Sequence, residues 1–369
     1  MIKEGKIGLQ EAICLVVIAT GNRVFFTAPT VLARAVGNTG WYMSIISNAV
    51  TLVSFTFIFL LLKRFPGKDI LEIYKISLGR FIGTVFSFIY AGSFLTATGV
   101  LLREFFEMLK SYVFQNTPIS YLNGAMVLLV SLTGILGLEA IARAAKLTAM
   151  TTLFGFTALL LLSIQNYKIS NLFPILGYGI GKTLWEGVTR SSAFSEVIIL
   201  AVIAGSLQGI QNIKKAGFLS ILLSGAVVSI GIFCLTLVFP YYSFQELTAP
   251  LYTLATLINY GAFFQRLDPA FLFMWMMITG ISSSIVFYCA VSSFCKTFRL
   301  QDKRPVILPM AVLLFAVTMI PPDLPSVVNE YIEILRLYPI LLFYVLPLIT
   351  LVIALLRKKK GVRIHVKGG

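Results

Sequence analysis

The sequence predicts an all-α integral membrane protein with ten transmembrane helices in a five-plus-five inverted repeat, in which helices 1 and 6 are discontinuous. Three observations predict this fold class: long apolar segments, positive charge gathered on one side, and matched interruptions in the first and sixth segments. The chain has 369 residues, of which 58% are hydrophobic and 12% charged. Soluble proteins carry about 25% charged residues, so the composition favours lipid as the surroundings of the chain.

Apolar segments long enough to cross a bilayer recur along the whole chain, since a spanning helix needs about 20 residues. Eight are free of charge: Trp41–Leu62, Phe81–Leu102, Ser111–Leu138, Leu147–Tyr167, Ala216–Gln245, Pro269–Cys295, Pro305–Pro322 and Leu337–Leu356. Two interrupted segments, about Leu9–Val36 and Trp185–Ile210, bring the number to ten. We therefore expect a single transmembrane domain over residues 1–369, with repeats over about 9–163 and 185–356 and a basic cytoplasmic tail over 357–369.

The placement of positive charge predicts the orientation of the chain. If the N-terminus is cytoplasmic and the segments alternate sides, 21 of the 30 Lys and Arg residues lie inside and 6 lie outside. Cytoplasmic loops of membrane proteins carry such an excess, so both termini are expected in the cytoplasm. The net charge of +15 is then explained by positive residues in the cytoplasmic loops of a protein whose partner is the lipid bilayer. No nucleic-acid partner is expected.

The first segment is interrupted by Thr20, Gly21, Asn22 and Arg23. Gly21 and Asn22 are poor helix formers, and an Arg at a helix centre costs about 2.5 to 3.5 kcal/mol on insertion into a bilayer. Unwound backbone at bilayer depth is tolerated only where it lines a cavity. One interpretation is a binding site in which half-helix N-termini hold a carboxylate and free carbonyls hold an ammonium. The other is a glycine kink with Arg23 in a structural ion pair.

The sixth segment is interrupted by small residues followed by a carboxylate. The candidate ligand-binding residues here are Ser191, Ser192, Phe194, Ser195 and Glu196. Glu196 is the deepest carboxylate in the predicted topology, which makes it a candidate partner for Arg23, a contact for a ligand amine or a proton site. A structural salt bridge is the alternative.

Two further segments carry small and polar residues at helical spacing. In the third, Ser93, Phe94 and Ala97 share a face that either lines a cavity or serves helix packing. In the eighth, Thr279, Ser282 and Ser283 either contact a ligand or ion, or hydrogen-bond to their own helix.

Charged pairs at i, i+4 spacing are expected near the outer interface, where Arg103 faces Glu107 and Glu186 faces Arg190 on solvated helix ends.

Catalytic chemistry is not indicated. The single histidine, His365, lies in the tail, so neither a zinc site nor a histidine-based triad is expected in the membrane. Gly177, Gly179 and Gly181 lack the preceding strand and following helix of a phosphate-binding loop. We therefore predict no enzyme, no metal and no cofactor.

Several short motifs resemble those of a known family. They are Gly-Lys-Ile-Gly-Leu-Gln-Glu-Ala (5–12), Gly-Asn-Arg-Val-Phe-Phe-Thr-Ala-Pro (21–29), Asn-Thr-Gly-Trp (38–41), Phe-Pro-Gly-Lys-Asp (65–69), Asn-Leu-Phe-Pro-Ile-Leu (171–176), the stretch Phe239–Pro250, and Phe263–Asp268 leading to Trp275. Together they resemble the B subunits of spore germinant receptors, the endospore germination permease family. That family is similar to the amino acid–polyamine–organocation superfamily.

The resemblance implies a protein of the spore inner membrane or cell membrane that senses a small-molecule germinant, often an amino acid. It implies partner subunits of the A type and of the lipoprotein C type. It also places the ligand pocket on Thr20–Arg23, the third-segment face, Ser191–Glu196 and the eighth-segment hydroxyls. Arg23 departs from the small or apolar residues of transporter relatives, which leaves an acidic or otherwise different germinant open. A proton- or sodium-coupled amino acid permease is the alternative function, because it would use the same pocket.

Overall fold

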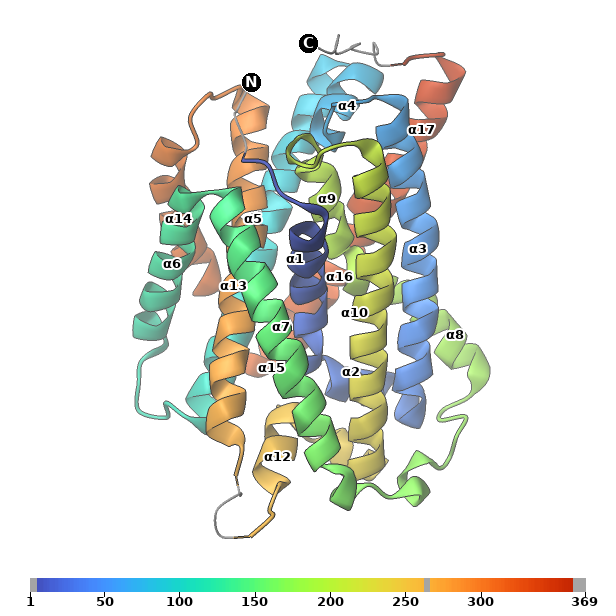
Figure 1. The fold of residues 1–369 in the computed structure, drawn as a ribbon, viewed down its shortest axis with the longest axis vertical. Helices are drawn as coiled ribbons and strands as arrows, with labels where there is room; N and C mark the ends of the chain where they lie inside the picture. Colours follow the sequence, from blue (N-terminus) through green and yellow to red (C-terminus); the bar gives the residue numbers. More distant parts are fainter. Residues whose placement is uncertain (1–4, 262–265, 361–369) are drawn as a thin grey trace.

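The computed structural model describes residues 5–261 and 266–360, and their regular structure is helical (Figure 1). Tail residue His365 and Phe263–Gln265 of the last motif lie outside the described residues. The helices are α1 (Leu9–Gly21), η1 (Asn22–Phe25), α2 (Ala28–Val36), η2 (Gly37–Thr39), α3 (Gly40–Arg64), α4 (Ile70–Ser77), α5 (Arg80–Tyr112), α6 (Ile119–Leu136), α7 (Leu138–Leu162), η3 (Ile164–Asn166), η4 (Ile169–Leu172), α8 (Ile180–Thr189), η5 (Ser191–Val197), α9 (Ile198–Val202), η6 (Ala204–Ser206), α10 (Ile210–Val238), α11 (Tyr241–Phe244), α12 (Pro250–Leu257), α13 (Asp268–Phe298), α14 (Arg304–Thr318), α15 (Leu324–Ser326), η7 (Val327–Tyr331), α16 (Ile332–Pro339), η8 (Ile340–Val345) and α17 (Leu346–Leu356).

Seven helical runs in the described residues are long and apolar enough to cross a membrane. They are Ala28–Arg64, Arg80–Tyr112, Ile119–Leu136, Leu138–Leu162, Ile210–Val238, Asp268–Phe298 and Leu324–Leu356. A shorter apolar helix covers Arg304–Thr318. The expectation of an all-helical membrane protein is thereby confirmed. Ten spans in a five-plus-five inverted repeat stay a prediction, because the helices of the two interrupted segments and Arg304–Thr318 are each shorter than a full membrane-spanning helix.

The first segment is discontinuous where the sequence predicts it. Helix α1 ends at Gly21, the 3-10 turn η1 follows, and α2 begins at Ala28. Phe26 between them is extended, with φ −105° and ψ −159°. Pro29 lies in the first turn of α2. The backbone N–H groups of the first turn have no partner within the helix, so a proline there costs no hydrogen bond. Gly21, Asn22 and Pro29 together therefore end one helix and begin the next.

The sixth segment is also discontinuous. Helix α8 ends at Thr189, and the 3-10 stretch η5 contains Phe194 at φ −111° and ψ 15°, outside helical values. Helix α9 then continues for only five residues. The backbone carbonyl of Ser191 accepts a hydrogen bond from the Tyr344 hydroxyl at 2.7 Å, so a side chain from the last helix satisfies the broken backbone.

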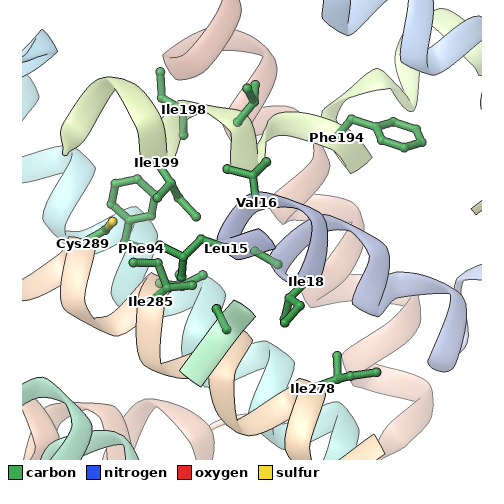
Figure 2. Close-up of a cluster of buried hydrophobic side chains, with 14 of the residues drawn as sticks. Leu15, Val16, Ile18, Phe94, Phe194, Ile198, Ile199, Ile278, Ile285 and Cys289 are labelled. Atoms are coloured by element: carbon green, nitrogen blue, oxygen red, sulfur yellow. The ribbon is translucent and has the colours of Figure 1, made fainter. Parts of the chain in front are cut away.

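Helix α1 lies in the centre of the bundle, packed against α7, α10 and α13 (Figure 1). Figure 2 shows Leu15, Val16 and Ile18 of α1 among apolar side chains of three other helices. These neighbours are Phe94 of α5, Ile198 and Ile199 of α9, and Ile278, Ile285 and Cys289 of α13. The break at Gly21 is therefore held in the interior by helices from both halves of the chain.

Close approach of α3 and α10 depends on small residues. A Cβ built on Gly217 would lie within 2.6 Å of three ring atoms of Phe55, and one on Gly225 would lie 2.4 Å from the Asn48 amide. Asn48 also donates a hydrogen bond to the Ile221 carbonyl at 2.7 Å. Small residues at membrane helix interfaces permit such contacts, and they fix the wall that α3 and α10 form beside the break in the first segment.

Two helices extend further than the sequence predicts. Helix α5 continues from Leu102 to Tyr112, so the Arg103–Glu107 pair (2.7 Å) lies inside it and is buried rather than solvated. The last helical run begins at Leu324 instead of Leu337 and includes Arg336. Both predictions ended at charged residues because hydropathy does not detect the ion pairs that allow charges to be buried.

Candidate functional site

A cavity of about 180 Å³ lies between the two breaks. Its walls come from α1 through α2, from α3, α5, η5, α9, α10 and α13, and from the last helical run at α16 and η8. A water molecule occupies about 30 Å³ of liquid, so the cavity has room for a small organic molecule. The two interrupted segments therefore meet at one cavity.

Ten of the predicted binding residues line this cavity: Asn22, Arg23, Ser93, Phe94, Ala97, Ser192, Phe194, Ser195, Glu196 and Ser282. The other five do not. Gly21 borders a separate void of about 40 Å³ between α1, α7 and α10. Ser191 is buried behind the cavity wall, where its carbonyl binds Tyr344.

Thr20 of α1 and Thr279 and Ser283 of α13 are buried, and their hydroxyls make no hydrogen bond within the described residues. Only Ser282 of this group reaches the cavity, and its hydroxyl donates to the Ile18 carbonyl at 3.2 Å.

Arg23 and Glu196 form an ion pair across the two breaks. Glu196 is the more buried partner, with 17% of its side chain exposed against 37% for Arg23. Pairing neutralises each charge at a depth where an isolated charge is costly. The sequence left open whether Arg23 and Glu196 form a structural ion pair or contact a ligand. In the structure the two side chains pair with each other, and both also border the cavity.

Several polar atoms on the cavity wall have no protein partner. Both amide atoms of Asn22, the Ser192 hydroxyl, Nε of Arg23 and Oε2 of Glu196 are buried and make no hydrogen bond within the described residues. A buried polar group without a partner costs about 1–3 kcal/mol. These atoms are therefore the positions where a bound molecule or water would be stabilised.

The sequence analysis missed Glu104, which lines the cavity and is 6% exposed. Its Oε1 accepts hydrogen bonds from the Thr27 backbone N–H at 3.1 Å and from the Thr27 hydroxyl at 2.6 Å. Thr27 is the N-cap of α2, so a protein carboxylate occupies this half-helix N-terminus. The expectation that the N-terminus holds a ligand carboxylate does not fit α2. The signal was present, because Glu104 continues the helix face of Ser93 and Ala97.

Two arginines of the outer charge pairs also reach the cavity. Arg190 pairs with Glu186 at 2.5 Å and lies 4.0 Å from Glu333, while Arg336 pairs with Glu333. Arg190 and Arg336 line the cavity, and their side chains are only 14% and 17% exposed. The expected Glu186–Arg190 pair is present, but it is part of the cavity wall rather than a solvated helix end.

The last helical run forms an unexpected wall of the cavity. It contributes Tyr338, Pro339 and Phe343, with Pro339 preceding the π-helical turn η8. Phe343 stacks on Phe94 of α5 with ring centroids 5.6 Å apart. Single π-helical turns occur often at functional sites, and a proline inside an apolar segment is a sequence signal for such an irregularity.

A helical membrane bundle with a central cavity between interrupted helices belongs to the class of secondary-transporter folds. The solved structure of a Na+-coupled sialic acid symporter, in a substrate-bound outward-open state, has a TM-score of 0.59 at 13% identity. The match covers 90% of this chain and 76% of the symporter chain. At this identity the likeness establishes the fold alone.

The sequence profile of the spore germination protein family matches residues 6–327, and the chain belongs to that family. It is 25% identical over 367 residues to spore germination protein KB of Bacillus subtilis (strain 168), covering 97% of both chains. It is 23% identical over 340 residues to spore germination protein YndE of the same strain, covering 89% of this chain and 91% of the relative. The protein is thus an integral membrane protein of a family of germination proteins.

We predict that Arg23 and Glu196 stabilise the fold as a unit. Arg23→Gln and Glu196→Gln should each lower the free energy of unfolding, because each leaves one charge unpaired inside the bundle. The double variant should lose less than the sum, with a coupling energy of about 1–3 kcal/mol, reduced from that of a fully buried pair by the partial exposure of Arg23. Unfolding by SDS titration in mixed micelles measures this cycle.

The matched control is the i, i+4 pair Glu139–Arg143, whose side chains are 46% and 71% exposed. Its cycle should give a coupling below about 0.5 kcal/mol, as for exposed pairs in general. Additive losses at Arg23 and Glu196 would show that the pair contributes nothing to the fold.

Proposed function

We propose that this chain is the germinant-sensing membrane subunit of a spore germination receptor, and that it binds a small molecule such as an amino acid in the cavity between its two breaks. The observation that carries the proposal is the cavity itself. It is bordered by both interrupted segments, and its wall contains buried polar atoms of Asn22 and Ser192 that make no hydrogen bond to the part of the chain that the structure describes. Few precisely placed polar groups in a mainly apolar pocket are typical of small-molecule sites.

The family and the distribution of charge suggest the partner subunits of the chain, its membrane and its orientation. Relatives that carry the names spore germination protein A2 and B2 match 93% and 97% of this chain. We infer an assembly with A-type and lipoprotein C-type subunits in the spore inner membrane. The excess of Lys and Arg on one side of the predicted topology favours cytoplasmic termini. The two matched breaks favour ten spans in a five-plus-five inverted repeat.

Sensing requires a route from the cavity to a surface that partners contact. Phe94 and Phe343 face the cavity, and Tyr90 packs on Phe343 with ring centroids 5.1 Å apart. The Tyr90 hydroxyl donates to the Leu342 carbonyl in η8 at 2.6 Å and lies 2.8 Å from the Tyr74 hydroxyl. Tyr90 has one hydroxyl hydrogen, so Tyr74 is the donor between the two phenols.

Tyr74 belongs to α4, a short helix at one end of the bundle that packs against the first turns of α5 (Figure 1). Burial of this phenol raises its pKa well above the ordinary value, so it stays protonated as a donor. Asp69, the N-cap of α4, pairs with Lys296 of α13 at 3.2 Å. In the proposed topology α4 lies on the cytoplasmic face, so a change in the cavity wall reaches that face through two side chains.

A ligand shifts a two-state receptor only by its differential affinity for the two states. The alternative is a proton- or sodium-coupled amino acid permease, which the symporter-like fold favours. Both functions use the same cavity, so they are separated by transport and not by binding.

The test combines binding and uptake by the purified chain. We expect at least one of the twenty proteinogenic amino acids to raise its melting temperature in detergent. Arg23→Gln and Glu196→Gln should each shift the concentration dependence, because both residues border the cavity. In proteoliposomes made from the chain alone, the same labelled amino acid should not accumulate under an imposed proton or sodium gradient.

Accumulation that Arg23→Gln abolishes would replace the sensor by the permease. The absence of any thermal shift across the amino acids would contradict ligand binding. Protein-free liposomes and the surface variant Glu139→Gln provide the controls.

We predict that Tyr90→Phe separates binding from response. The substitution removes the hydrogen bonds to Leu342 and Tyr74 and keeps the ring that packs on Phe343. Ligand affinity of the purified chain should therefore stay within about threefold, while the ligand concentration for half-maximal spore germination rises about tenfold, corresponding to about 1.4 kcal/mol.

Tyr121→Phe is the matched control, because Tyr121 is 74% exposed on α6. An unchanged germination response in Tyr90→Phe spores with normal receptor levels would remove this route from the account.

A further inference from the structure

Glu104 differs from the other charged residues of the cavity wall. The cavity is lined by Arg23, Glu104, Arg190, Glu196 and Arg336. Arg23 pairs with Glu196, and the other two arginines pair with Glu186 and Glu333. Within the described part of the chain, Glu104 has no Lys or Arg nitrogen within ion-pair distance, so it is the charged residue of this wall that makes no salt bridge. Arg23 and Arg336 act on it electrostatically, but from beyond contact distance.

The neighbouring arginine does not supply this counter-charge. Arg103 turns to Glu107 at 2.7 Å and to the Pro322 carbonyl at 2.7 Å, on another face of α5. Both recorded hydrogen bonds of Glu104 end on Oε1, while Oε2 makes none within the described residues. A bound cation could donate a charge-assisted hydrogen bond to Oε2 and so give this second carboxylate oxygen a partner.

The N-terminus of α2 orients Glu104 toward this role. Thr27 holds one carboxylate oxygen through its N–H and its hydroxyl, and the positive end of the helix stabilises the ionised form. A ligand carboxylate at the same place would meet a fixed negative charge instead of free N–H groups. The end of the cavity at α2 is therefore suited to a cation and not to an anion.

The breaks present hydrogen-bond donors to the same cavity. The Asn22 amide, Nε of Arg23 and the Ser192 hydroxyl are buried and make no hydrogen bond within residues 5–261 and 266–360. Asn22 and Ser192 are each 2% exposed. These groups can donate to an anionic or polar group of a ligand. The cavity thus has one end that fits an ammonium and a second set of groups that fits a carboxylate.

We propose that Glu104 binds the ammonium group of the ligand, which places the amine at the N-terminus of α2 and any carboxylate at Asn22, Arg23 and Ser192. This inference rests on the proposed function and adds the orientation of the ligand. The orientation is the reverse of the one expected from the sequence, in which half-helix N-termini hold the carboxylate.

The experiment compares three probes for each amino acid that binds: the amino acid, the amine that lacks its carboxylate, and the acid that lacks its amine. Binding to the purified full chain in nanodiscs is measured by displacement of the labelled amino acid. The amine should retain measurable affinity, and the acid should bind at least about 30-fold more weakly than the amino acid, as expected when one partner of a buried charge pair is lost.

The variant Glu104→Gln keeps an acceptor for Thr27 and removes the charge. It should weaken the amino acid and the amine by at least about 30-fold and leave the acid unchanged. Glu139→Gln, a surface carboxylate far along the chain on α7, should leave all three affinities unchanged.

Two results overturn the inference while the proposed function stands. One is wild-type protein that binds the acid better than the amine, and this result needs no variant to fold. The other is a Glu104→Gln variant that binds the amino acid within about threefold of wild type. Glutamine has the shape of glutamate without its charge, so this result would show that the charge of Glu104 does not contribute to binding. Wild-type protein that binds none of the amino acids contradicts the proposed function and this inference together.

Discussion

The ion pair between Arg23 and Glu196 is the interaction on which the rest of the site depends. It joins two segments that lie 173 residues apart in the chain, each at the point where its helix is interrupted. An arginine at this depth needs a partner, and a glutamate needs the same in return. The pair therefore links the irregular backbone to the cavity that it borders.

The remaining walls of the cavity come from unbroken helices of both halves, namely α3, α5, α10 and α13, and from the irregular last helical run. Helix α5 brings Glu104 to the N-terminus of α2, and η8 brings Phe343 against Phe94. The same η8 turn presents the Leu342 carbonyl to Tyr90, which connects it to α4. One wall thus contacts both the proposed ligand position and a helix at the end of the bundle. That arrangement fits a sensor, because a ligand that alters the wall also alters a distant surface.

The sequence predicted the breaks well because their causes are local. Gly21 and Asn22 weaken a helix wherever they occur, and the serines of 191–195 do the same by competing for backbone hydrogen bonds. Ser93, Ala97 and Ser282 were found because helical spacing places them on one face. Thr279 and Ser283 were predicted for the site on the same grounds but are buried outside the cavity, since composition alone does not fix the rotation of a helix.

The residues that were missed depend on tertiary pairing. Glu104 and Arg336 lie next to predicted ends of apolar segments, and hydropathy treats such charges as boundaries. Arg190 lies within the predicted segment Trp185–Ile210 but was expected near the outer interface on a solvated helix end. All three are tolerated inside the bundle because Thr27, Glu186 and Glu333 satisfy them. Those partners come from other helices or from another turn, which a single sequence does not reveal. Tyr338 and Phe343 were missed because nothing in the sequence announces which face of the last helix meets α5.

A structure of the chain in nanodiscs, determined by electron cryomicroscopy with a saturating amino acid ligand, tests the central claim most directly. The account predicts ligand density inside the cavity, in contact with residues of both breaks and with α5, while Arg23 and Glu196 remain close to each other. Density at another site, with this cavity empty at saturating ligand, would contradict the claim that the two interrupted helices form the binding site.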